Sequence, residues 1–193
     1  MDDWAPWHPI ELSKRLTGIS RFWCVVGGWA LDLWHGEQTR DHEDLEFTVL
    51  REDVAAFRRQ LASMQYFAAH AGNIRPLAAD EAPSDDISQI WCHDPGIGRW
   101  RADMMIEPGD RQSWVYKNAP DIKRPRAEMV FVNRAGIPYL NPAAVLLFKA
   151  KYRRAKDEAD FSAACPKLPA HERLWLKTCL ETCHPGHAWG ASL

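Results

Sequence analysis

The sequence has no apolar run that approaches the roughly 20 residues of a membrane-spanning helix, so we expect no membrane anchor. Asp2 and Asp3 follow Met1, where a secretory signal would carry basic residues and then an apolar stretch, and this favours a cytoplasmic protein. Internal repeats and low-complexity tracts are also missing. With 46% hydrophobic and 26% charged residues among 193, what remains is an ordinary globular protein.

The sequence also lacks an excess of basic residues. Lys and Arg together number 24 and Asp and Glu 26, which gives a formal net charge of −2. Proteins that bind nucleic acid usually carry a basic surface, so this balance argues against nucleic acid as a partner. The ten tryptophans are spread from Trp4 to Trp189, and we interpret them as packing residues of the core and its rim rather than as a surface that stacks sugars.

Paired cysteine spacing is absent as well. The five cysteines indicate a protein that keeps its thiols reduced. Four potential zinc ligands lie close together, namely Cys179, Cys183, His184 and His187. Zinc sites usually join two ligand pairs across a longer loop, so this purely local cluster favours the end of a helix at His184 over a metal site.

The spacing of apolar residues predicts a mixed α and β protein. Short apolar or alternating segments, typical of strands, occupy 21–28, 44–50, 65–70, 86–92, 100–107, 127–132 and 136–140. Helical spacing occupies 9–18, 28–36, 51–64, 142–155, 156–165 and 169–183. We therefore expect an α+β fold with a mixed sheet flanked by helices in residues 1–140, followed by a helical segment in residues 141–193.

Two carboxylates stand one residue apart on a predicted strand. Asp44 and Glu46 alternate with the apolar Leu45 and Phe47, so the two acids share the opposite face. Carboxylates this close repel one another, and a protein that keeps them together often uses them to hold a cation. Oxygen ligands favour Mg²⁺. A solvated strand face is the alternative interpretation of such a pair.

A third acid lies further along the chain. Asp103 and Glu107 share one face of the predicted strand 100–107. If this strand lies beside the one with Asp44 and Glu46, Asp103 completes a set of three carboxylates. Such a set around two Mg²⁺ ions performs in-line displacement at phosphorus, and the third acid can accept the proton of the attacking hydroxyl. Glu107 is the second choice, because it ends the strand before Pro108.

Several residues near the acids suit a phosphate. Gly27 and Gly28 end a predicted strand and open a helix, where backbone can approach a ligand and a helix start favours anions. A tight strand–helix turn explains the pair equally well. Arg40, after Thr39, could reach a phosphate or form a surface salt bridge. Lys149 directly follows an apolar run and is the candidate for a lysine at the β- or γ-phosphate, while the neighbouring basic residues fit a solvated face.

Together these features resemble the nucleotidyltransferase superfamily, and within it the aminoglycoside 2″-adenylyltransferase-like branch. The match covers residues 25–50 well and residues 99–108 loosely. The matching residues are Gly27, Gly28, Trp29, Ala30, Asp32, Gly36, Thr39, Arg40, His42, Asp44 and Glu46.

The resemblance implies a nucleotidyltransferase-like mixed sheet, Mg²⁺ as cofactor, and ATP or another nucleoside triphosphate as donor. The reaction would transfer a nucleoside monophosphate to a hydroxyl of a small molecule, with an aminoglycoside as the analogy, and release pyrophosphate. Asp44 and Glu46 would be metal ligands, and Asp103 the third ligand and the base. Gly27 and Gly28 would lie at the phosphates.

One residue departs from the family pattern. Glu46 stands where Asp is common, and its extra methylene moves the carboxylate outward by about one bond length, which disfavours the near-ideal octahedron of Mg²⁺. The alternative function is therefore a catalytically weak or inactive nucleotide-binding protein, such as a regulator or a toxin–antitoxin component. For the acceptor, the acids in 80–86 could attract a polycation, although a solvated loop is the interpretation we favour.

Overall fold

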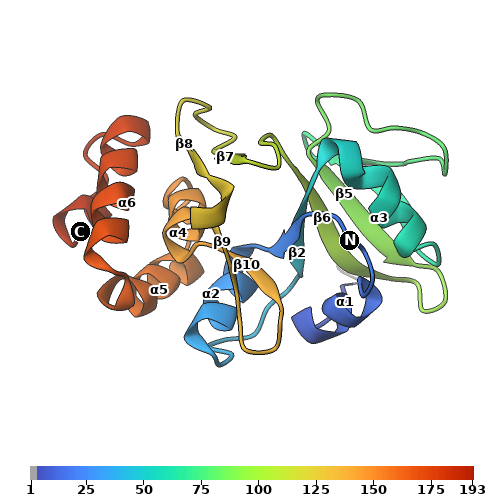
Figure 1. Ribbon diagram of the computed structural model, residues 1–193, viewed down its shortest axis with the longest axis horizontal. Helices are drawn as coiled ribbons and strands as arrows, with labels where there is room; N and C mark the ends of the chain where they lie inside the picture. Colours follow the sequence, from blue (N-terminus) through green and yellow to red (C-terminus); the bar gives the residue numbers. More distant parts are fainter. Residues whose placement is uncertain (1–3) are drawn as a thin grey trace.

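The computed structural model describes residues 4–193 and contains one large mixed sheet with helices around it (Figure 1). Eight strands form this sheet in the order β4-β3-β5-β6-β2-β1-β10-β9. Their bounds are β1 Trp23–Val25, β2 Glu46–Leu50, β3 Gln65–His70, β4 Asn73–Pro76, β5 Gln89–Asp94, β6 Arg99–Glu107, β9 Val130–Val132 and β10 Pro138–Leu140. A second, two-stranded sheet consists of β7 Ser113–Val115 and β8 Lys123–Pro125.

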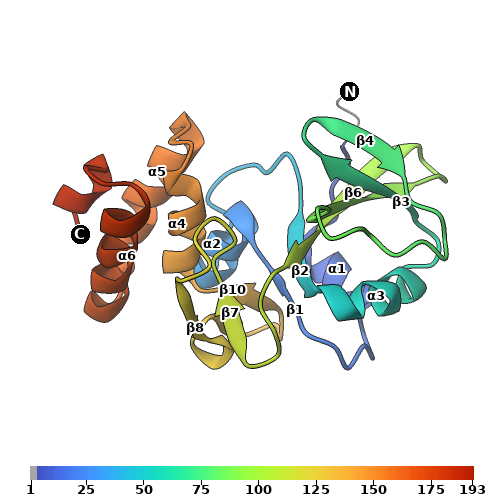
Figure 2. The same ribbon diagram turned by 90° about the horizontal axis from the view of Figure 1, so that it is seen from above.

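The helices divide into two groups. Their bounds are α1 Pro9–Arg15, α2 Gly27–His35, α3 Val54–Gln60, α4 Pro142–Ala150, α5 Ala155–Ala164 and α6 Ala170–Cys183, with 3₁₀ turns at Arg51–Asp53, Arg126–Glu128, Cys165–Lys167 and Ala188–Ala191. Figure 1 places α4, α5 and α6 at the end of the molecule opposite β5, and Figure 2 places them opposite β3. Figure 2 shows α1 and α3 on one side of β3 and β6.

Local sequence signals explain where the helices begin and end. The His8 side chain accepts a hydrogen bond from the backbone N–H of Ile10 and caps α1, and the Asn141 side chain does the same for Ala143 in α4. Both helices carry proline in the first turn, where the missing N–H has no intrahelical partner. Gly36 ends α2 in the left-handed conformation, with φ of 83°.

The sequence-based fold prediction is confirmed as a mixed sheet flanked by helices. The pairs β2–β6 and β1–β10 are parallel and the others are antiparallel. The strands β4, β7 and β8 were not expected. One buried core runs from Trp7 to Trp189, and α4 packs on α2, so the change of secondary structure near residue 140 does not interrupt the core. None of the helices in residues 4–193 has the length and hydropathy of a membrane span.

Candidate active site

Two acidic residues face each other where β2 and β6 run side by side, and a third, Asp44, lies just before β2. Glu46 begins β2 and lies directly opposite Asp103 of β6 in a parallel register, so their side chains share one face of the sheet. The backbone N–H of Asp103 donates to the carbonyl of Leu45 at 2.8 Å, which extends the pairing toward Asp44. Asp44 is exposed and Asp103 is buried. The expected neighbouring of these two strands is therefore confirmed.

Burial and nearby negative charge raise the pKa of both opposed carboxyl groups. Burial, and after it the negative charge of Asp44, raises the pKa of Glu46 to about 6. Burial, and after it the charge of Glu46, raises the pKa of Asp103 to about 8. Gln89 Nε2 donates to Asp103 Oδ2 at 2.7 Å, whereas the buried Asp103 Oδ1 has no hydrogen-bond partner in residues 4–193. A cation between the carboxylates would relieve the repulsion and satisfy this oxygen.

The donor chemistry of this face suits Mg²⁺, but the carboxylates do not yet converge. Within the described residues, no three Asp, Glu, His or Cys side chains lie close enough together to hold a metal ion. Carboxylate oxygens are nevertheless the ligands that Mg²⁺ prefers, and Asp103 Oδ1 has no competing partner there. The residues therefore fit the ion by chemistry, and binding requires Asp44, Glu46 and Asp103 to turn toward a common point.

The second group of potential metal ligands consists of the cysteines and histidines near residue 180. In the part of the chain that the structure describes, they do not form a ligand group. The helix α6 ends at Cys183, with His184 as its C-cap. His187 Nε2 lies 3.1 Å from the carbonyl of Ala150. The expectation of a helix end at His184 is confirmed.

The start of α2 borders the carboxylates. Gly27 has φ of 64°, and a Cβ at this position would collide with the carboxylate of Glu46. No side chain caps this helix start, so its first N–H groups are available to a phosphate. A Cβ on Gly28 would instead collide with the side chains of Arg40 and His42. Gly27 thus lies at the site, while Gly28 allows the following loop to pack.

Thr39 and Arg40, which we expected at the phosphates, have other partners in the structure. Thr39 donates to Asp32 Oδ1 through its N–H at 3.1 Å and its hydroxyl at 2.5 Å, and His42 Nε2 lies 2.5 Å from Asp32 Oδ2. The Arg40 guanidinium donates to both carboxylate oxygens of Asp160 on α5, at 3.0 and 3.1 Å. A pocket adjoins the carboxylates on the side of α4, and neither side chain lines it. These bonds fix the loop that leads into β2.

Lys149 lines the pocket and is held by the acids of α5. Its Nζ lies 2.8 Å from Asp160 Oδ2 and 3.3 Å from Asp157 Oδ1, and the side chain is buried. Asp157 also accepts a hydrogen bond from the backbone N–H of Arg154 at the start of α5. Asp160 is shared, because it binds both Lys149 and Arg40.

This arrangement predicts a specific loss of stability in acid. Burial alone would raise the pKa of Asp160, but the hydrogen bonds from Arg40 and Lys149 outweigh it and lower the pKa. A lowered folded-state pKa contributes stability above the unfolded value of about 3.9, and this contribution is lost as the pH falls through the folded pKa. The difference in unfolding free energy between the wild type and Asp160→Asn should stay constant from about pH 7 to about pH 5 and shrink below about pH 4.

Urea unfolding of both proteins across this pH range checks that expectation. The comparison with Asp160→Asn is needed because the raised pKa values of Glu46 and Asp103 act in the opposite direction in both proteins. A difference that remains unchanged well below pH 4 would contradict the assignment of Asp160 as an ionised partner.

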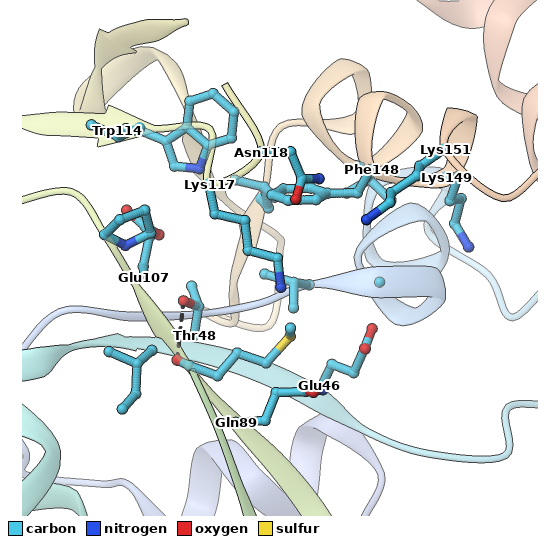
Figure 3. A pocket seen from close by; sticks show the side chains of 18 of the residues that line it. Glu46, Thr48, Gln89, Glu107, Trp114, Lys117, Asn118, Phe148, Lys149 and Lys151 are labelled. Carbon is cyan, nitrogen blue, oxygen red and sulfur yellow. Dashed lines mark hydrogen bonds between the residues drawn. The ribbon is translucent and has the colours of Figure 1, made fainter. Parts of the chain in front are cut away.

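A pocket of about 450 Å³ adjoins the carboxylates on the side of α4. Its walls include Glu46, Thr48, Gln89, Trp114, Lys117, Phe148, Lys149, Lys151 and Arg154. Figure 3 shows the Lys117 side chain extending from its loop toward the strand that carries Glu46 and Thr48. The apolar Trp114 and Phe148 lie on the same side of the pocket as this loop (Figure 3). The pocket therefore combines an aromatic wall with several cations.

Sequence reasoning missed part of this basic group. Lys151 and Arg154 were assigned to a solvated face, yet both line the pocket. Lys117 was not considered at all, because no strands were expected around the loop between β7 and β8. Within the described residues Lys117 forms no ion pair. The only sequence signal for it is a lysine in a loop, which is too common to identify a site.

Glu107 is engaged by a neighbouring arginine. Its Oε1 accepts a hydrogen bond of 2.5 Å from Arg126 Nη2, and Arg126 also donates to the backbone carbonyls of Asp110 and Ser113. Burial raises the pKa of Glu107, although Arg126 acts in the opposite direction. This acid therefore anchors the turn that leads from β6 into the small sheet.

The sequence matches a known family over most of its length. The model of the aminoglycoside-2″-adenylyltransferase family matches residues 10–143. This range contains Asp44, Glu46 and Asp103 and ends at the start of α4. No curated protein matches the chain.

Solved structures with a similar fold come from antibiotic-modifying enzymes. The crystal structure of ANT(2″)-Ia in complex with adenylyl-2″-tobramycin has a TM-score of 0.59 at 13% identity, over 90% of this chain and 97% of that one. The lincomycin-bound lincosamide antibiotic adenylyltransferase LnuA has a TM-score of 0.55 at 16% identity, over 79% and 90%. The solution structure of ANT(2″)-Ia has a TM-score of 0.55 at 14% identity, over 91% and 89%. At these identities the similarity concerns the fold.

Proposed function

The chain belongs to the aminoglycoside-2″-adenylyltransferase family, and we propose that it is a Mg²⁺-dependent nucleotidyltransferase. It moves a nucleoside monophosphate from ATP or another nucleoside triphosphate to a hydroxyl of a small antibiotic-like molecule and releases pyrophosphate. The observation that carries this proposal is the pairing of Glu46 with Asp103 on one sheet face, beside an uncapped helix start and a basic pocket.

The triphosphate of the donor lies between the start of α2 and the basic pocket. Backbone N–H groups beginning at Gly27 bind phosphate oxygens, and the helix start favours negative charge. Lys117, Lys151 and Arg154 supply positive charge from the other side. Lys149 is already balanced by two aspartates, so it keeps a fixed position at the pocket wall.

The carboxylates perform the transfer. The acceptor hydroxyl oxygen attacks the α-phosphorus while the bond from that phosphorus to the bridging oxygen of the β-phosphate breaks. The hydroxyl proton passes to Asp103, which lies at the sheet centre and accepts it as a base. Asp44, Glu46 and Asp103 would hold Mg²⁺, which would supply positive charge to neutralise the phosphates and lower the pKa of the hydroxyl. Pyrophosphate leaves along the basic pocket.

Two of the similar proteins support an antibiotic-like acceptor. The structure of ANT(2″)-Ia holds adenylyl-2″-tobramycin, and LnuA was solved with lincomycin. Both compounds are small and carry several hydroxyls. The fold is shared with this chain, so the same class of acceptor is the one to test first.

Pyrophosphate release with Mg²⁺, each nucleoside triphosphate and a panel of such antibiotics tests the proposal. Release that depends on the acceptor, is lost in Asp44→Ala and persists in Asp41→Ala is the expected result. Asp41 is a suitable control because it is an exposed acid of the same loop. Nucleotide binding without release would favour the alternative of an inactive nucleotide-binding protein and would direct attention to Glu46.

Lys117 offers a sharper test of the phosphate site. In Lys117→Met the KM for the nucleotide should rise about tenfold, because a hydrogen bond to a charged group contributes about 1.5–3 kcal/mol and about 1.4 kcal/mol corresponds to tenfold. The KM for the acceptor should not change. Steady-state kinetics of both substrates measures this. Lys123→Met on the same hairpin is the matched control, and an equal effect in the two variants would remove Lys117 from the site.

A further inference from the structure

The paired acids lie at the border between two chemically different parts of one sheet face. On one side is the basic pocket. On the other side the cross-strand register continues, with Asp103 opposite Trp91 of β5 and Trp91 opposite Phe67 of β3. A single row across four strands therefore consists of Glu46, Asp103, Trp91 and Phe67, and paired residues of neighbouring strands share a face. The row passes directly from carboxylates to aromatic rings.

A bulge in β6 brings a further tryptophan to this face. One step along β5, from Cys92 to His93, corresponds to two steps along β6, from Ala102 to Trp100. Arg101 is the extra residue, and its guanidinium lies over the ring of another tryptophan, at 5.6 Å. A bulge redirects the side chains that follow it and is common beside active sites. Here it places Trp100 on the same face as His93.

Five rings then form a continuous surface, which we call the aromatic cluster: Trp4, Phe67, Trp91, His93 and Trp100. The ring centroids of Trp91 and Trp100 are 5.3 Å apart, those of Phe67 and Trp100 5.0 Å, and those of Trp4 and Trp91 5.3 Å, all edge to face. His93 lies 4.9 Å from Trp100. Every member is half-buried. The cluster is thus fixed by its own contacts and still presents ring surface.

The helices nearby pack on the other face of the sheet. Phe57 of α3 lies against Phe47, with centroids 6.3 Å apart, and Phe47 points away from its neighbour Glu46 along the strand. Figure 2 shows α1 and α3 together on one side of β3 and β6. The face with the aromatic cluster therefore belongs to the active-site side.

In-line displacement assigns a role to this surface. The entering hydroxyl and the leaving pyrophosphate must lie on opposite sides of the phosphorus. If pyrophosphate leaves along the basic pocket, the acceptor enters from the opposite side, past Asp103. We infer that the aromatic cluster is the acceptor site, and that the acceptor is a glycoside with a flat apolar ring face and little positive charge. This inference rests on the proposed function.

The charges around the cluster decide between a weakly charged acceptor and a polycation. His93 is the only titratable member. Two of the acids in 80–86, which a polycation could have used, have other partners: Glu81 Oε1 lies 2.7 Å from Arg75, and Asp86 lies 4.0 Å from His70. A polycation needs several facing carboxylates, and those beside the cluster are the ones assigned to Mg²⁺. Aromatic rings instead bind flat apolar faces.

Indole N–H spectra of the full protein, ¹⁵N-labelled at tryptophan and saturated with Mg²⁺ and a nonhydrolysable ATP analogue, test the inference by direct binding. Lincomycin, a glycoside with a single amino group, should shift the signals of Trp91 and Trp100 and leave that of Trp34 on α2 unchanged. Tobramycin, which carries several amino groups, should shift them much less. No shift with either compound, or shifts with tobramycin alone, would overturn the inference.

Kinetics separate this inference from the proposed function. Trp91→Ala should raise the acceptor KM, or the dissociation constant if turnover is absent, about tenfold, equivalent to about 1.4 kcal/mol. The nucleotide dissociation constant should not change, Trp91→Phe should retain most of the affinity, and Trp34→Ala should behave as wild type. If Asp44→Ala abolishes pyrophosphate release while Trp91→Ala and Trp91→Phe both leave the acceptor KM unchanged, the function stands and the acceptor site lies elsewhere.

Discussion

Replacement of Asp103 by asparagine should abolish nucleotidyl transfer while the protein folds as before. Proton transfer to a positioned base alone contributes about 10²–10⁴-fold to a rate, and the variant also loses a charged ligand for Mg²⁺, so we expect kcat to fall at least about 1000-fold. The asparagine carbonyl can still accept the hydrogen bond that Gln89 donates to the buried Asp103. The melting temperature should therefore not decrease.

Single-turnover pyrophosphate release measures this loss, and calorimetric titration with nucleotide shows whether the donor still binds. Asp94→Asn is the matched control, because Asp94 is an acid on the neighbouring strand β5 that accepts a hydrogen bond from the backbone of Gly96. It should transfer at the wild-type rate. A kcat for Asp103→Asn within tenfold of the wild type would mean that another group accepts the proton, and Glu107 would be the next residue to replace.

The position of the carboxylates could be predicted from the sequence because it depends on local rules. Alternation predicted one strand face for Asp44 and Glu46, but β2 begins at Glu46 and Asp44 lies in the loop before it, whereas the apolar flanks of Asp103 correctly identify a second strand. Their direct pairing required one further assumption, that the two strands are neighbours, and the register of Glu46 with Asp103 confirms it. The helix α2 was also expected, although its pattern was placed at 28–36 and the helix begins one residue earlier, at Gly27.

The rest of the site depends on contacts that no local pattern encodes. Arg40 and Asp160 are 120 positions apart, so the partner of the arginine could not be identified from its neighbourhood. Lys117 lies between two strands of three residues each, which are too short to give a periodic signal. The face of Trp100 is set by the bulge at Arg101, and strict alternation from Asp103 would place it on the opposite side.

The second large effect concerns stability, and it should follow from Asp160→Ala. Asp160 is buried and binds Arg40 and Lys149, and Lys149 is itself buried. Removal of one partner from a buried ion pair costs about 3–5 kcal/mol, because an uncompensated charge stays in the interior. For a chain of this length, 1 kcal/mol lowers the melting temperature by about 2–4 °C, so a decrease of roughly 6–12 °C is expected for the lower figure. Glu181→Ala, an exposed acid on α6, should change it little.

A double variant shows which charge is responsible. If the ammonium of Lys149, left with Asp157 as its one carboxylate partner within the described residues, causes most of the loss, Asp160→Ala combined with Lys149→Met should be more stable than Asp160→Ala alone. If the lost partner of Arg40 causes most of the destabilisation, Lys149→Met should give no recovery, because Arg40 lacks Asp160 in both variants. The same comparison bears on catalysis. Since Asp160 connects the pocket lysine on α4 to the loop that precedes the carboxylates, its loss should weaken nucleotide binding even at temperatures where the variant remains folded.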